Sequence, residues 1–124
     1  MSGLSKEYGK RGNAMAMYRV FPGPDDESHI EPLKLEDHAN LEAFNNITEA
    51  GIHYYPELRK MDFHPLNERR LIIHLTGEVE IGLSDGSKQV FRPGDVRLME
   101  DVRGPGHTHE DLSLGSAFVM MLKD

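Results

Sequence analysis

The stretch that decides the fold is Gly77–His107, GEVEIGLSDGSKQVFRPGDVRLMEDVRGPGH. Apolar and polar residues alternate over Glu78–Leu83, which predicts a half-buried strand. Ser84–Ser87 is predicted to form a hairpin turn, and Gln89–Arg92 the returning strand. A Pro-Gly-Asp turn then leads into a third strand, Val96–Met99. The stretch therefore predicts antiparallel β-structure.

Strands are also predicted on both sides of this stretch. They are Met15–Phe21, His29–Leu35, Gly51–Pro56, Lys60–His64, Arg70–Leu75 and Ser116–Leu122. One short helix, from Asp37 to Ala43, is the only helix expected, and Asp101–Thr108 is expected to be a loop. Short strands separated by Gly and Pro turns about every eight to twelve residues indicate an all-β sandwich or barrel.

Length and composition restrict the class of protein. The 124 residues fit one domain over residues 15–124, preceded by a flexible tail over residues 1–14. Fourteen Lys and Arg against 21 Asp and Glu give 14 − 21 = −7, which disfavours nucleic acid and anionic membranes as partners. The absence of cysteine excludes disulfides and thiolate chemistry. Without a signal peptide or a long apolar run, the cytoplasm is the expected location.

His107 and His109 are the sharpest local feature. On an extended chain a His-x-His spacing puts both rings on one face, because side chains alternate with period two. Two such imidazoles can bind one cation or exchange a proton near neutral pH. A solvated pair in a surface loop is the alternative, and the spacing alone does not decide between them.

A second polar group lies on the predicted strand Arg70–Leu75. Arg70 and His74 share one face, and Leu71, Ile73 and Leu75 share the other. In a sandwich the apolar face is the core, whereas in a barrel with a ligand cavity the polar face points inward. Glu100 and Asp101 add an acidic pair, one member of which can orient a histidine or act as a base.

The run Gly77–His107 resembles the cupin superfamily, and the resemblance covers roughly residues 60–110. Its end, Leu98–His107, is similar to a subgroup of small single-domain cupins with an Asp-x-x-Gly-x-Gly-His segment. The resemblance implies a double-stranded β-helix, or jelly-roll, barrel with a cavity at its open end, and a homodimer. The apolar face of Arg70–Leu75 and the strand Phe118–Leu122 also favour a homodimer, because they need cover.

The resemblance also implies a ligand set that this sequence alters. His107 matches the metal-binding histidine of the second cupin motif, and His64 lies near the first histidine of the first motif. Leu66 stands where the next histidine would be, and Arg70 replaces the glutamate. Two alternatives remain: a reduced site for one divalent transition metal (Zn, Fe, Ni or Mn) on His64, His107 and His109, or a metal-free cavity.

Three hypotheses of function follow. The first is a small-molecule enzyme acting on an anionic or carbonyl-bearing substrate, either an acid–base isomerase, cyclase or lyase, or a metal-dependent oxygenase. Its catalytic candidates are His107, His64 and Glu100, and its substrate-binding candidates are Arg70, His74 and His109. The second is a non-catalytic module that binds a small ligand. The third is a structural dimerisation unit with a filled barrel, in which Arg70 pairs with a carboxylate such as Glu80.

Overall fold

A computed structural model gives the structure of the chain and describes residues 16–38 and 47–123. The expected flexible tail and residues 39–43 of the expected helix lie outside the described residues. Before that gap, Leu35–Asp37 forms one turn of 3-10 helix (η1), so Asp37 ends a helical turn where the sequence predicted that it begins one. No helix within the described ranges is long and apolar enough to span a membrane.

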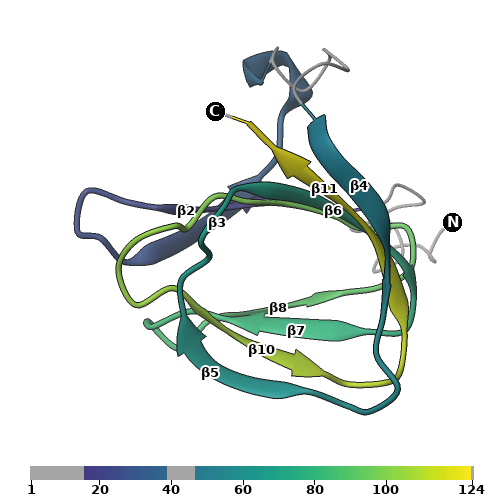
Figure 1. Ribbon diagram of the computed structural model, residues 1–124. Coiled ribbons are helices and arrows are strands. Elements are labelled where there is room, and N and C mark those ends of the chain that lie inside the picture. Colours follow the sequence, from purple (N-terminus) through teal and green to yellow (C-terminus); the bar gives the residue numbers. More distant parts are fainter. Residues whose placement is uncertain (1–15, 39–46, 124) are drawn as a thin grey trace, which may run out of the picture.

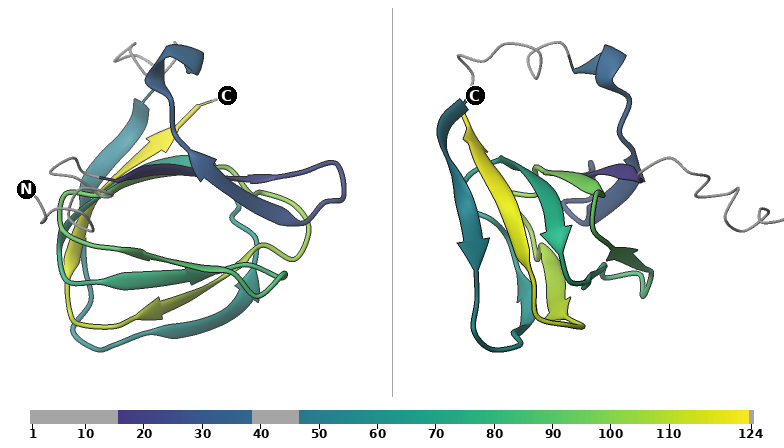
Figure 2. Two further views of the ribbon diagram at one scale, coloured as in Figure 1. Left: turned by 180° about the vertical axis from the view of Figure 1, so that it is seen from behind. Right: turned by 90° about the vertical axis from the view of Figure 1, so that its right-hand side faces the viewer.

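In the described part of the chain, ten strands (β2 to β11) form two sheets that face each other (Figure 1). The four-stranded sheet has the order β5-β10-β7-β8, made of Lys60–His64, His107–Asp111, Val79–Gly82 and Lys88–Phe91. The six-stranded sheet has the order β3-β2-β9-β6-β11-β4, made of Ser28–Pro32, Met17–Pro22, Val96–Met99, Arg70–Thr76, Ser116–Leu122 and Ile47–Tyr54. All pairs are antiparallel except β2 with β9. Seen from behind, the ribbons close into a barrel (Figure 2).

The predicted fold class, an all-β jelly-roll barrel, is confirmed in the described residues. Strands β5, β9 and β11 have the predicted boundaries, and the hairpin turn before β8 contains Gly86 at a positive φ of 91°. One prediction is wrong: β10 begins at His107, inside the expected loop. The two histidines of the His-x-His pair therefore lie on a paired strand in the four-stranded sheet, where both are buried.

The six-stranded sheet buries side chains on both of its faces. Its inner face contributes Val20, Ile72, Met99 and Val119 to a core between the sheets. On its outer face Leu98 packs with Leu33 and Leu122, which are also buried. Leu98 and Met99, which are neighbours on β9, are thus both fully buried. They point to opposite faces of the sheet because the side chains of a strand alternate with period two.

Candidate functional site

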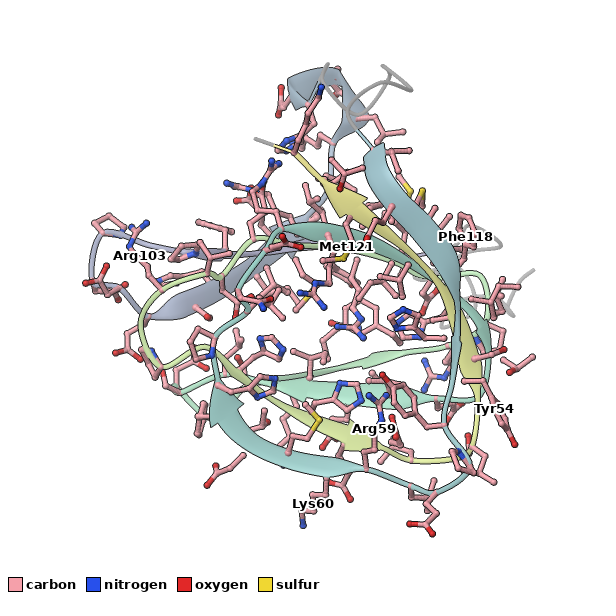
Figure 3. The ribbon with its side chains drawn as sticks, viewed as in Figure 1. Tyr54, Arg59, Lys60, Arg103, Phe118 and Met121 are labelled. Carbon is pink, nitrogen blue, oxygen red and sulfur yellow. The ribbon has the colours of Figure 1, made fainter. Side chains whose placement is uncertain are left out.

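A cavity of about 230 Å³ lies between the two sheets, and side chains of both sheets line it. Three guanidinium groups reach it, those of Arg59, Arg70 and Arg97. Five imidazoles also line it, those of His53, His64, His74, His107 and His109. Figure 3 shows nitrogen-rich side chains, Arg59 among them, pointing into the space between the sheets. This protein of net charge −7 therefore encloses a cluster of cationic and neutral nitrogen groups.

Strand pairing explains how this cluster forms. On β6, Arg70, Ile72 and His74 share the face that lines the cavity. Ile72 lies directly across from Arg97 on the neighbouring strand β9, so the guanidinium of Arg97 enters on the same wall. Leu75 points away and is 40% exposed. The polar face of β6 is therefore its inner face, as the barrel alternative required.

Arg97 is a buried cation hydrogen-bonded to a neutral group. It is 5% exposed, and its Nε–H donates to Nε2 of His74 over 2.9 Å. Burial, and then the positive charge of Arg97, lower the pKa of His74 to about 3, so the ring is neutral and can accept this bond. Burial likewise lowers the pKa of Arg97 to about 9, which leaves it charged at neutral pH. Within the described residues no carboxylate is hydrogen-bonded to Arg97.

Arg59, by contrast, is neutralised by a carboxylate. Its Nε and Nη2 donate to the two oxygens of Asp111 over 2.8 and 3.2 Å, and its guanidinium lies 3.6 Å above the ring of Tyr55. Nε2 of His109 lies 2.8 Å from Asp111 Oδ1, and burial lowers the pKa of this histidine to about 4. Burial alone would raise the pKa of Asp111, but the hydrogen bonds from Arg59 and His109 lower it to about 2.

His107 forms a buried pair with Asp101. Nδ1 of His107 lies 2.6 Å from Oδ2 of Asp101, and the two side chains are 2% and 0% exposed. Ser28 donates to the same oxygen over 2.8 Å, whereas Oδ1 has no hydrogen-bond partner in the described structure. Because the carboxylate accepts a bond from Nδ1–H, the unprotonated nitrogen of a neutral His107 is Nε2.

His64 lies beside His107 and has the same tautomer. Its Nδ1 donates to the carbonyl oxygen of Asp62 over 2.8 Å, and the two rings are 4.9 Å apart at 52°. Gly106 permits this approach: its φ is +78°, and a Cβ there would overlap the backbone carbonyl of His64. The two imidazoles can thus each present a basic Nε2 at one end of the cavity.

Five of the six predicted site residues line this one cavity: His64, Arg70, His74, His107 and His109. Glu100 does not. Its carboxylate accepts bonds from Arg19 over 2.6 Å and from Arg69 over 2.7 and 2.9 Å, outside the cavity lining. Its neighbour Asp101 is the residue that orients a histidine. Sequence reasoning missed Arg59, Arg97 and Asp111, which no spacing motif marks.

The suggested pairing of Arg70 with Glu80 is wrong. Arg70 donates instead to the backbone oxygen of Glu68 over 3.3 Å and to Oδ1 of Asn67 over 3.1 Å. Glu80 lies on β7, and its carboxylate is 3.6 Å from Nζ of Lys88. The guanidinium of Arg70 is therefore left with neutral acceptors only, in the described structure.

The donor set does not fit a divalent cation. Among the described residues no three His, Asp or Glu side chains are placed to hold a metal together. His64 and His107 are adjacent, but Nε2 of His109, the third predicted ligand, contacts Asp111 and lies 3.1 Å from Nη2 of Arg59. Guanidinium groups cannot ligate a metal and repel one. The reduced metal site predicted from the sequence is therefore not assembled.

No protein-family model and no curated protein match the sequence. Among solved structures, a cupin superfamily protein (DSY2733) of Desulfitobacterium hafniense matches with 17% identity and a TM-score of 0.43, over 84% of this chain and 95% of that one. Protein NMB1881 of Neisseria meningitidis matches with 16% identity and a TM-score of 0.36, over 75% of this chain and 100% of that one.

Proposed function

We propose that this chain is a small cupin enzyme that binds a small anionic molecule in its barrel and moves protons on it. The observation that carries the proposal is Arg97, a buried guanidinium that lines the cavity and, among the described residues, is hydrogen-bonded only to a neutral imidazole. A buried charge without a partner costs several kcal/mol. An anionic ligand would supply that partner, and the fork of a guanidinium suits a carboxylate in particular.

The size of the cavity restricts the ligand. At about 230 Å³ the cavity is smaller than the roughly 300–1,000 Å³ of pockets that bind drug-sized ligands. This size favours a small organic acid over a ligand as large as a nucleotide. The ligand class is therefore a compact carboxylic acid or a similar anion.

His107 is the group that would move the proton. Its Nε2 can accept a proton from a carbon next to a carbonyl group, and the carboxylate of Asp101 stabilises the imidazolium that results. The electron pair left on the substrate forms an enolate, and return of the proton to the enolate oxygen or, in a β,γ-unsaturated substrate, to the γ-carbon completes an isomerisation. His64, whose ring lies 4.9 Å from that of His107, can take the same role.

Binding is tested by calorimetric titration with succinate at low ionic strength. Wild-type protein should bind it, and Arg97→Met should weaken binding at least tenfold, because a charge-assisted bond contributes about 1.5–3 kcal/mol. Arg103→Met is the matched control, since Arg103 pairs with Asp26 on the exposed surface. Equal affinity in all three proteins would contradict the anion site.

Acid–base activity is tested without knowing the product. Small oxo acids, such as pyruvate and 2-oxoglutarate, are incubated in D₂O, and the loss of their C–H proton signals is followed by NMR. We expect exchange above the protein-free rate for at least one acid, lowered about 10²–10⁴-fold by His107→Gln. Binding without any exchange would favour the alternative, a non-catalytic binding module.

We also propose that the protein is a cytoplasmic homodimer. Ile52, Phe118 and Ile73 form a row across β4, β11 and β6, and Ile52 is 65% exposed. Figure 3 shows Phe118 and Tyr54 on the side of the barrel that faces away from the cavity. A second copy would cover this apolar row. Light scattering should give twice the chain mass for wild type and the chain mass for Phe118→Glu; a monomeric wild type would contradict the dimer.

A further inference from the structure

The three arginines of the cavity differ in what their guanidinium groups contact. Arg59 is bound by the carboxylate of Asp111 through two hydrogen bonds. Arg97 donates to the ring of His74, and Arg70 donates to a carbonyl and an amide oxygen. The acceptors of Arg70 and Arg97 are all neutral. The described structure therefore contains two cavity-lining cations that no carboxylate binds.

These two cations lie on one wall of the cavity. Arg97 is paired with Ile72 across the β6–β9 ladder, and Arg70 is two residues before Ile72 on the same face. They are close enough for the charge of Arg70 to lower the pKa of Arg97. The carboxylates whose charge acts on Arg97, those of Asp101 and Asp111, already accept bonds from His107 and Arg59. The wall thus has two separate positions for anionic groups.

We propose that the ligand is a short dicarboxylic acid, with one carboxylate on Arg97 in the interior and the other on Arg70 at the His64 end of the cavity. This inference rests on the proposed function, because it assumes that the cavity binds an anion. Each guanidinium can offer a pair of parallel N–H donors to a carboxylate. A cavity of about 230 Å³, below the usual range for drug-sized ligands, favours a short diacid of three to five carbons. The chain between the carboxylates then passes His107, where a proton can be removed.

The experiment compares diacids with their monoamides. Malonate, succinate and glutarate, and the monoamide of each, are titrated into wild type, Arg70→Gln, Arg97→Met and the control Arg103→Gln. Arg103 pairs with Asp26 in an exposed contact, and neither residue lines the cavity, so the substitution is matched in chemistry but outside the proposed wall. Circular dichroism and melting temperature show whether each variant is folded.

We expect at least one diacid to bind wild type about tenfold or more tightly than its monoamide. Arg70→Gln should abolish that preference while changing the affinity for the monoamide less than about twofold, and Arg103→Gln should change neither. Equal binding of every diacid and its monoamide, or equal losses for both in Arg70→Gln, would overturn the dicarboxylate assignment and leave the anion site at Arg97 intact. Failure of all six compounds to bind would overturn the proposed function itself.

Discussion

The Nε–H of Arg97 donates to Nε2 of His74 over 2.9 Å in the interior of the barrel. In this bond a buried cation donates to an imidazole nitrogen, which can accept the hydrogen bond only while the ring is neutral. The pair therefore fixes the direction of the guanidinium but does not neutralise its charge. The charge that remains is the basis for the proposed anion site, and it has consequences for stability as well as for binding.

The first prediction concerns the cost of that charge. Arg97→Met removes a buried cation without a carboxylate partner, so we expect the free energy of unfolding to stay the same or to rise by up to about 2 kcal/mol, although ligand binding is lost. Arg59→Met should have the opposite effect and lower the free energy of unfolding by about 1–3 kcal/mol, because Asp111 would be left buried without its guanidinium partner. Urea unfolding measures both. A large destabilisation by Arg97→Met would show that the charge is already compensated.

The second prediction concerns pH. The pKa values of His74 and His109 are lowered in the folded state to about 3 and about 4, so between pH 6.5 and about 4 the unfolded chain binds protons that the folded chain does not. Stability is therefore complete above about pH 6.5 and falls on acidification, by about 1 kcal/mol per pH unit for each histidine. The free energy of unfolding should decrease steadily from pH 7 to pH 4.5.

His74→Gln tests the assignment of this slope. Glutamine can still accept the bond from Arg97 through its amide oxygen but cannot be protonated. Its unfolding free energy should depend on pH less steeply than that of the wild type, by about 1 kcal/mol per pH unit. A slope that His74→Gln does not alter would mean that other groups cause the acid sensitivity.

The third prediction separates two neighbouring carboxylates. Asp101→Asn should lower any C–H exchange activity about 10²–10⁴-fold, because an amide no longer holds His107 as the Nδ1–H tautomer or stabilises its imidazolium. Long-range ¹H–¹⁵N NMR of the ring should show the change of tautomer directly. Glu100→Gln, which alters only the ion pairs with Arg19 and Arg69, should leave tautomer and exchange unchanged. The same tautomer in both variants would contradict the positioning role of Asp101.

The fourth prediction concerns metal removal. Because guanidinium groups line the cavity and His109 is engaged by Asp111, protein purified without a nickel column should contain far less than one transition metal per chain. EDTA should leave its melting temperature unchanged. Stoichiometric metal that is lost together with His64→Gln and His107→Gln would show instead that the side chains rearrange around a cation.

The strands were predictable because their signals are local. Alternation predicted β5, a Pro-Gly-Asp turn preceded β9, and a run of apolar residues marked β11, and all three boundaries agree with the structure. The start of β10 was missed because Gly104, Pro105 and Gly106 are typical of a loop that continues. Only the pairing of His107 with His64 on β5 shows that the strand begins there.

The site was predictable only in part, because a sequence does not state which face of a strand points inward. Arg70 and His74 could be grouped by parity, but their position in the cavity follows from the closure of the barrel. Arg97 stands in the run Val-Arg-Leu-Met, where no local pattern separates it from a solvated arginine. The signal that places Arg97 at the cavity is its pairing with Ile72, and this pairing follows only from the register between β6 and β9. Arg59 lies in an irregular segment, and its hydrogen bond to Asp111 holds the guanidinium at the cavity.

The most direct test of the account follows the side chain of Arg97 itself. Its Nε–H signal can be observed by ¹H–¹⁵N NMR while succinate is added, with Arg103 as the exposed reference. We predict a saturable change in the signals of Arg97 and of the His74 ring, and none for Arg103. An Arg97 signal that does not move while succinate shifts only exposed arginines would contradict the existence of an anion site in the barrel.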